Sequence, residues 1–274
     1  MAIDVQVLGV GLLGPGLASW DEARPVLKGE LRHASVPCVV PAPQRLPAAE
    51  RRRAGAAVKI AMAVADAACS QADIDPQGLA TVFTSSNGDG ANCHALLEAL
   101  ASTNPVDRLI SPTRFTNSVH NAASGYWHIT VAGRQASTSL CAHDQSFSAG
   151  LVAALTQVHS LQAPVLLVAS DSPYPEPLHA VRPLPDGMGV ALLLAPPDWR
   201  GHHKRIARLA VDMLPRGQAG PATRCTRDGL EALRTAIPAA RALPLLQALA
   251  QREPAEVVVD AQGSLALKVR ATFG

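Results

Sequence analysis

The stretch from Ala136 to Ala169, ASTSLCAHDQSFSAGLVAALTQVHSLQAPVLLVA, decides the fold. Residues 136–140 form a short run that favours a strand, residues 147–159 form an apolar helical segment, and residues 164–169 form a strand of aliphatic residues. A strand, a helix and a second strand in succession are typical of a sheet that is covered by helices. The stretch therefore predicts an α/β fold.

The same alternation of strands and helices continues on both sides of this stretch. Further strands are predicted at residues 5–10, 81–85, 189–194 and 205–213, and in a terminal hairpin of residues 256–260 and 265–269. Helices are predicted at residues 20–27, 47–72, 93–101 and 118–131, and at 229–249 with interruptions at Pro238 and Pro244. The proline-rich segment 33–47 is predicted to be an extended loop. Small side chains in 47–72 indicate close packing of that helix.

The composition is that of a folded protein of one or two domains, because 48% of its 274 residues are hydrophobic and 17% are charged. A formal net charge of +2 and nine Phe, Trp and Tyr residues offer neither a basic surface nor many rings for nucleic acid. The sequence has no apolar run long enough for a membrane span, and Asp4 stands where a signal peptide would be basic. We therefore expect a cytoplasmic protein that binds no nucleic acid and has no membrane span.

The cysteines do not form a metal-binding or disulfide pattern. They are odd in number, widely spaced and free of any CxxC pair: Cys38, Cys69, Cys93, Cys141 and Cys225. We expect reduced thiols that are buried as small apolar side chains. We expect no metal and no cofactor.

The glycines after the first predicted strand match the pattern GxGxxG from Gly9 to Gly14. A dinucleotide site needs a helix that begins at the third glycine, because the helix N-terminus receives the pyrophosphate. Here Pro15 and Gly16 follow, and the next predicted helix begins only near Ser19 or Trp20. The pattern therefore favours a glycine-rich turn between a strand and a helix.

The most unusual segment is FTNSVHNAASGYWHI, residues 115–129. It gathers polar and small residues just before and inside a predicted helix, where Asn or Ser caps the helix and small residues allow a close neighbour. His120 is interpreted here as a hydrogen-bonded structural histidine in preference to a catalytic base.

Several segments, in order along the chain, resemble the β-ketoacyl synthase superfamily and, within it, the short ketosynthase-like chain-length factors of aryl polyene gene clusters. They are VQVLGVGLLGPG, LPAAERRRAG, VFTSSNGDG, SPTRFTNSVHNAASGYWHI, SFSAGLVAAL and PVLLVASDSPYPEPL, and they cover about residues 3–195. The resemblance implies a dimeric protein with a thiolase-like layered α-β-α-β-α fold that is truncated in its C-terminal half. We expect one domain of residues 1–274, with the N-terminal ketosynthase half in 1–195 and a shortened remainder in 196–274.

The resemblance also implies where a nucleophile would stand. In ketosynthases a cysteine occupies the turn before the helix that corresponds to 147–159, and the helix N-terminus stabilises its thiolate. Here no cysteine directly precedes that helix, and the equivalent position is Asp144 or Gln145. Chain-length factors carry a glutamine there, and a glutamine forms no thioester. Cys141, several residues earlier at the strand end, is the runner-up nucleophile.

Active ketosynthases carry two further histidines in their C-terminal part, which stabilise the enolate of the extender unit. In this chain the last histidine is His203. Without those groups the developing negative charge has no evident donor. We therefore expect no catalytic residue for decarboxylative condensation.

The leading hypothesis is a non-catalytic homologue that pairs with an active β-ketoacyl synthase and shapes the tunnel in which a chain on an acyl carrier protein grows. Its interface and tunnel residues are predicted to be Phe115, Asn117, Ser118, His120, Asn121, Tyr126, Trp127 and Phe147. One alternative is an acyltransferase or thioesterase that uses Cys141 with His143 or His120. Another is a malonyl decarboxylase that uses Gln145.

Overall fold

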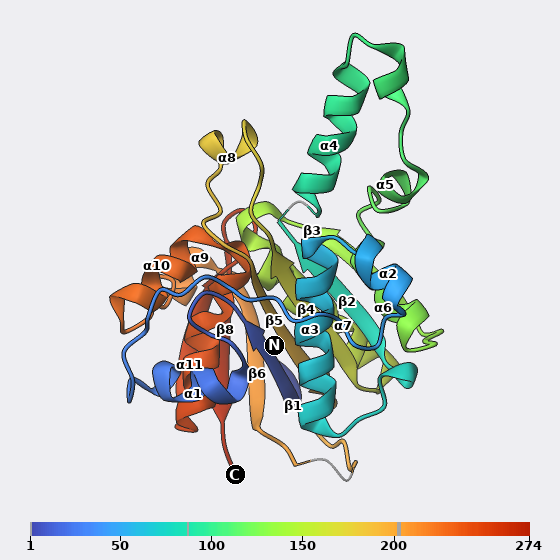
Figure 1. Ribbon diagram of the computed structural model, residues 1–274. Coiled ribbons are helices and arrows are strands. Elements are labelled where there is room, and N and C mark those ends of the chain that lie inside the picture. The colour runs from blue at the N-terminus through green and yellow to red at the C-terminus, as the bar shows by residue number, and fades with distance from the viewer. Residues whose placement is uncertain (1, 87, 202–203) are drawn as a thin grey trace.

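The computed structural model describes residues 2–86, 88–201 and 204–274. In these ranges eight strands form one mixed sheet in the order β3-β2-β4-β5-β1-β6-β8-β7 (Figure 1). The strands are β1 (Ile3–Leu13), β2 (Ala80–Ser85), β3 (Ser137–Cys141), β4 (Val165–Asp171), β5 (Met188–Ala195), β6 (Ala207–Pro215), β7 (Ala255–Asp260) and β8 (Leu265–Thr272). β2 pairs in parallel with β3 and β4, and the other neighbours are antiparallel. The predicted α/β fold is confirmed.

Helices cover both faces of this sheet. They are α1 (Trp20–Lys28), α2 (Ala48–Arg53), α3 (Ala56–Ala72), α4 (Gly90–Ala101), α5 (Pro112–Thr116), α6 (Ala122–Thr130), α7 (Ser146–Leu161), α8 (Leu178–Val181), α9 (Arg216–Ala219), α10 (Asp228–Ala236) and α11 (Leu243–Gln251). Short 3₁₀ turns lie at η1 (Pro76–Gly78), η2 (Pro105–Arg108), η3 (His143–Gln145) and η4 (Pro238–Ala242). The described residues include no helix that is long and apolar enough to cross a membrane.

The layers follow from which side chains the helices bury. α3 and α6 pack on one face of β1, β2, β4 and β5 through Val64, Trp127 and Leu193. On the other face α7, η4 and α11 form a central helical layer, and β6, β7 and β8 curve around it to pack Leu209, Val257 and Leu267 into the same core. On the outer side of β7 and β8, Ala219 of the short α9 packs with Val258 and Ala266 in a third, small cluster. The result is the expected layered α-β-α-β-α architecture with a much reduced outer layer.

The outer face of β6 and β8 is suited to water rather than to a covering helix. Along β8, buried residues alternate with the partly or fully exposed Lys268 and Arg270. Arg270 donates to Asp212 of β6 at 2.9 Å, and the Nζ of Lys268 lies 2.9 Å from Glu256. An antiparallel sheet tolerates one solvated face when its side chains alternate in this way. The outer face of β6 and β8 therefore carries polar side chains where the small outer layer does not cover it.

The glycines at the start of the chain have a different role from the predicted one. β1 continues to Leu13, so Gly9 and Gly11 lie inside a strand and not in a turn. A Cβ at Gly9 would overlap the carbonyl oxygen of Ala68, and one at Gly11 would overlap that of Val64. The absence of a side chain lets the backbone of α3 rest directly on β1. The prediction of a turn was wrong for these two glycines, and the turn comes later, where Gly16 adopts a φ of +65°.

Two predicted helices are shorter in the structure. The helix predicted at 47–72 is divided into α2 and α3, because Ala54 is extended and Gly55 lies against the carboxylate of Asp89, where a side chain would overlap. The helix predicted at 118–131 begins only at Ala122, after a turn. The predicted interruption at Pro238 is confirmed as η4, whereas Pro244 lies in the first turn of α11, where its missing N–H costs no hydrogen bond.

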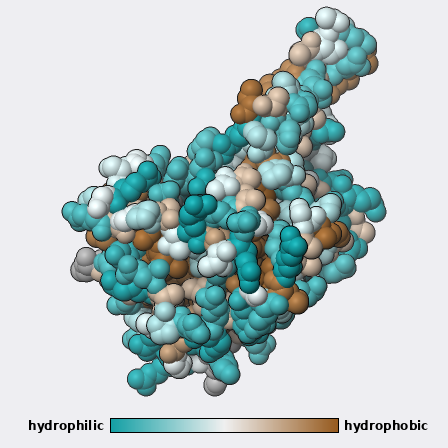
Figure 2. All heavy atoms as spheres, turned by 90° about the vertical axis from the view of Figure 1, so that its left-hand side faces the viewer, coloured by the Kyte–Doolittle hydropathy of each residue, from teal (hydrophilic) through white to brown (hydrophobic). Residues whose placement is uncertain are grey.

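Residues 90–117, which we call the arm, project from the body of the protein. The arm consists of α4, the segment with η2, and α5 (Figure 1). Figure 2 shows it standing clear of the rest of the molecule, with hydrophobic residues along it. Leu97, Val106, Leu109 and Phe115 are 64%, 70%, 78% and 66% exposed, respectively. The arm therefore carries apolar surface that the chain does not bury by itself.

Candidate functional site

The polar residues of the site lie where the parallel strands β3, β2 and β4 end. Cys141 is the last residue of β3, Ser85 is the last of β2, and Asp171 is the last of β4. The carboxyl ends of parallel strands meet at one edge of a sheet, so these residues gather there. Residues far apart in the chain meet as a result: the backbone N–H of Ser86, next to Ser85, donates to Asp171, which lies 85 positions later. The predicted nucleophile position and the runner-up both lie at this edge.

The turn from β3 to α7 is held by the buried Ser146. Its hydroxyl accepts from the backbone N–H of Ala142 at 3.0 Å and lies 2.7 Å and 2.9 Å from the carbonyl oxygens of His143 and Ser85. His143 adopts a φ of +52°, which is costly for a residue with a side chain and persists here because its surroundings fix the turn. Gln145 follows as the residue before α7, and its backbone N–H donates to Ala142 at 2.9 Å.

Asp144 lies in an ion-pair network. The Nη2 of Arg182 donates to its Oδ1 at 2.8 Å, and the Nη2 of Arg241 lies 3.9 Å from its Oδ2. The Nη1 of Arg182 also lies 2.6 Å from the Nε2 of His143. The carboxylate and the imidazole of this turn therefore face guanidinium groups. The sequence analysis did not single out either arginine, because neither belongs to a local motif.

A third residue that the sequence analysis did not single out, Asp171, connects three parts of the fold. Its side chain is buried, and its two oxygens accept from the backbone N–H groups of Ser86 and Ala239, both at 2.7 Å. Burial raises the pKa of this carboxyl, and the two backbone hydrogen bonds oppose that shift. An acidic residue two positions beyond a predicted strand end was a signal that sequence reasoning had available, since ligands and functional groups gather at strand ends.

The structure brings Cys141 together with His120. The Sγ of Cys141 lies 2.7 Å from the Nε2 of His120 and 3.9 Å from the Oγ of Ser85. Burial raises the pKa of the Cys141 thiol, Asp171 raises it further, and the hydrogen bond with Ser85 lowers it. Of the two histidines that were considered as its partner, His120 is the one in contact, because the ring of His143 turns to Arg182.

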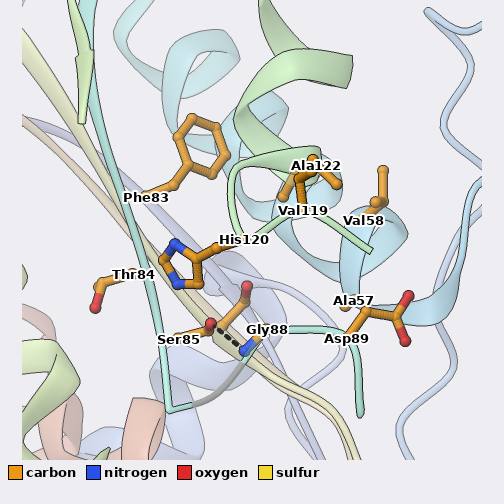
Figure 3. Close-up of a pocket in the computed structure, with 12 residues that line it drawn as sticks. Ala57, Val58, Phe83, Thr84, Ser85, Gly88, Asp89, Val119, His120 and Ala122 are labelled. Atoms are coloured by element: carbon orange, nitrogen blue, oxygen red, sulfur yellow. Dashed lines mark hydrogen bonds between the residues drawn. The ribbon is translucent and has the colours of Figure 1, made fainter. Parts of the chain in front are cut away.

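His120 and Ser85 also line a small cavity between β2, α3 and the segment before α6 (Figure 3). Its apolar wall is formed by Val58, Phe83 and Val119. In Figure 3 the imidazole of His120 lies beside Thr84 and Ser85, and the Oγ of Ser85 accepts from the backbone N–H of Gly88 at 2.8 Å.

The predicted interface residues fall into two groups. Phe115, His120 and Asn121 are exposed, and Ser118 and Tyr126 are partly exposed. Three are buried inside the chain: Asn117, Trp127 and Phe147. Trp127 fills the cluster between α3 and α6, Phe147 lies in the central layer, and Asn117 donates to the carbonyl oxygen of Arg53 at 3.0 Å. The apolar residues of α4 and of the segment that follows it were not predicted.

All five cysteines are free thiols, as the sequence predicts. Cys69 and Cys225 are buried, and Cys38 is partly buried. Cys93 and Cys141 are exposed, so the prediction of burial was wrong for these two, which lie on the solvent side of α4 and at the end of an edge strand. Within the described residues, no cluster of three or more histidine, cysteine, aspartate or glutamate residues is arranged to hold a metal ion.

The two edges of the sheet differ. At β7, the backbone of Val258 donates to the hydroxyl of Thr223 and accepts from its N–H, both at 2.8 Å, so this edge is partly covered. At β3, no further strand pairs with residues 137–141 in the part of the chain that the structure describes. A free edge presents unpaired backbone groups to which another chain can add.

Solved structures with the same fold include complexes of ketosynthases. A ketosynthase (ApeO) in complex with its chain length factor (ApeC) from Xenorhabdus doucetiae matches with a TM-score of 0.71 and 24% identity, over 97% of this chain and 98% of that one. The ishigamide ketosynthase/chain length factor matches with a TM-score of 0.73 and 14% identity, over 99% of both chains. A type II acyl carrier protein in complex with its ketosynthase bound to the hexaketide (AntDE:AntF) matches with a TM-score of 0.76 and 10% identity, over 100% of both chains.

No curated protein matches the sequence. The family model for the N-terminal domain of β-ketoacyl synthases matches residues 24–254, which is most of the chain. This match agrees with the layered fold. The chain therefore belongs to the β-ketoacyl synthase family.

Proposed function

We propose that this protein is a chain-length factor, a ketosynthase homologue that does not itself condense acyl units but pairs with an active β-ketoacyl synthase in the cytoplasm. The observation that carries the proposal is that the chain leaves two surfaces uncovered, the apolar surface of the arm and the edge of β3, where no further described strand pairs. Burial of one large apolar side chain contributes about 1.5–3 kcal/mol, so Leu97, Val106, Leu109 and Phe115 together supply a strong driving force for association.

The turn between β3 and α7 supports the non-catalytic part of the proposal. Asp144 is engaged by Arg182, and Gln145, which precedes α7, has no nucleophilic atom. A thioester at this position would need a thiolate at the helix N-terminus. The last histidine of the sequence is His203, which precedes β6. From β6 onward the chain therefore has no imidazole that could stabilise an enolate.

The partner would supply the nucleophile and receive the acyl carrier protein. A ketosynthase that covers the arm and the β3 edge would meet the exposed Phe115 of the arm, and also the exposed His120 and Asn121, which lie between the arm and α6. We propose that these side chains contribute to the wall of the tunnel in which the acyl chain grows, as in polyene or fatty-acid-like biosynthesis. Their bulk would then limit the length of the product.

Co-expression with a candidate ketosynthase followed by size-exclusion chromatography tests the proposal. The wild-type chain should co-elute with the ketosynthase as a single complex. A chain with Leu109→Asp and Phe115→Asp should not co-elute, whereas Val39→Asp, at an 80% exposed position outside the arm, should behave as the wild type. A wild-type chain that stays a monomer refutes the proposed function, and an intact complex of the double variant refutes the role of the arm.

A further inference from the structure

Charged side chains gather where the turns η3 and η4 meet. η3 carries His143 and Asp144, and η4, which packs against η3, carries Arg241. Arg182, the residue after α8, reaches the same place and donates to Asp144 at 2.8 Å. Two guanidinium groups, an imidazole and a carboxylate from three separate segments therefore lie close together.

The position of η4 is fixed from the inside of the protein. The backbone N–H of Ala239 donates to the buried carboxylate of Asp171 at 2.7 Å. The other oxygen of that carboxylate accepts from the backbone N–H of Ser86, also at 2.7 Å. Arg241 lies two residues beyond Ala239, so its backbone belongs to a turn that is anchored to the end of β4. A binding group gains from such a support, because its geometry is set before a ligand arrives.

The two arginines differ in how their N–H donors are used. Arg182 donates to Asp144, and its Nη1 lies 2.6 Å from the Nε2 of His143. Its Nε lies 3.4 Å from the hydroxyl of Tyr174, so each of its three nitrogens has a partner. In the part of the chain that the structure describes, the guanidinium of Arg241 donates no hydrogen bond. Its Nε is buried without an acceptor, and its Nη2 lies 3.9 Å from Asp144.

A guanidinium in this position calls for an anion. It has five N–H donors, and a donor that is withdrawn from water without an acceptor lowers the stability of the protein. Among the described residues, Asp144 is the one carboxylate within ion-pair distance of Arg182 or Arg241, and it lies closer to Arg182. Asp171 does not fill the gap, because backbone donors occupy both of its oxygens. The charge of Arg241 therefore has no close counter-charge of its own.

The chemistry of the donors favours a carboxylate as the missing anion. The two oxygens of a carboxylate match two N–H groups of one guanidinium, so that the pair forms two parallel hydrogen bonds. The side chains of Arg182 and Arg241 are 23% and 22% exposed, so a small ligand can reach them from solvent. Their partial burial also keeps salt from screening the attraction as strongly as it does on an open surface.

We propose that Arg241 and Arg182 form a binding site for a small monocarboxylate between η3 and η4. The oxygens of the ligand accept from the guanidinium of Arg241, while Asp144 keeps Arg182 in place beside it. Binding is reversible and involves no covalent step. The site goes beyond the chain-length-factor role, because every group in it belongs to this chain and none of them requires a partner subunit.

Thermal unfolding of the full-length chain in increasing sodium acetate tests the site, with sodium chloride at the same ionic strength as the baseline. Acetate should raise the Tm along a saturating curve that gives an apparent Kd. Arg241→Gln should weaken binding by about tenfold or more, the expected loss for hydrogen bonds to a charged group. The matched control is Arg134→Gln, an exposed arginine in the turn after α6, which should bind as the wild type does. A rise in Tm no larger than that in chloride, or equal affinities of the wild type and Arg241→Gln, would overturn the proposal.

A second variant should strengthen binding, so that a loss of folding cannot imitate the result. Asp144→Asn keeps the shape of the side chain and removes the carboxylate that competes for the guanidinium groups. Acetate should then bind about fivefold more tightly, the upper range for a charge pair that is partly exposed. Unchanged or weaker binding of acetate to this variant would contradict the proposal. These measurements use the chain without its ketosynthase, so they and the co-elution test of the proposed function can fail independently.

Discussion

Glu231 of α10 is a buried carboxylate that accepts hydrogen bonds from three residues of the C-terminal part of the fold. It is 9% exposed and accepts from both the Nε and the Nη2 of Arg234 at 2.6 Å. It also accepts from the backbone N–H of Cys225 at 2.8 Å and from Arg224 at 3.2 Å. These bonds connect the loop before α10 to the helix. Glu231→Gln keeps the shape of the side chain and removes its charge.

The expected loss follows from the bonds that weaken. A hydrogen bond to a charged group contributes about 1.5–3 kcal/mol and a neutral one about 0.5–1.5 kcal/mol, and the amide must turn its NH₂ group toward one of the donors. Loss of one partner from a buried ion pair costs about 3–5 kcal/mol. We expect Glu231→Gln to lower the free energy of unfolding by about 3 kcal/mol. For a chain of this size that corresponds to a Tm lower by about 5 °C.

The effect should depend on pH, with a defined sign. Arg234 and the other donors lower the pKa of Glu231 from 4.5 to about 2. The folded pKa is depressed, so the contribution is fully present above pH 4.5 and is lost as the pH falls toward 2. The difference in Tm between the wild type and Glu231→Gln should therefore be largest at pH 7 and shrink at pH 3.

Thermal unfolding followed by circular dichroism at pH 7 and pH 3 measures this difference. The control is Glu253→Gln, an exposed position at which the Tm should change little. A Tm difference that stays constant or grows on acidification would refute the assignment of the stabilisation to the charge of Glu231. A loss no larger than that of the control would refute its magnitude.

Three further predictions concern the elements that position the site. Gly11→Val should lower the free energy of unfolding in urea by about 3 kcal/mol or more, because its side chain meets the backbone of α3, whereas Gly217→Ala, with open space around it, should change it by less than about 0.5 kcal/mol. Asp171→Asn should cost about 1–3 kcal/mol in the same assay, because one of its two backbone donors loses its acceptor. Arg182→Gln should speed amide hydrogen exchange in residues 143–145, and unchanged exchange there would show that the ion pair does not hold the turn.

Features that depend on neighbouring residues were predicted correctly from the sequence, whereas features that depend on contacts between distant residues were not. The strand, helix and strand of residues 136–169 correspond to β3, α7 and β4, because hydrophobic periodicity is a local property. Gly9 and Gly11 were predicted to form a turn. Their packing partner, α3, lies about fifty residues further along the chain, so the residues next to the two glycines give no sign of it. The helix predicted at 47–72 is likewise interrupted at Ala54 and Gly55, where the carboxylate of Asp89, a residue outside it, lies against the backbone.

The amino-acid sequence by itself determined the α/β class, the family and the position of the turn between β3 and α7, since each of these is carried by short contiguous segments. Only the tertiary structure decided which side chains meet at that turn. It paired Cys141 with His120 and not with His143, and it turned Asp144 toward Arg182, because parallel strands gather their ends at one edge whatever their separation along the chain. It also decided that the arm stands free, since exposure results from the folding of the whole chain.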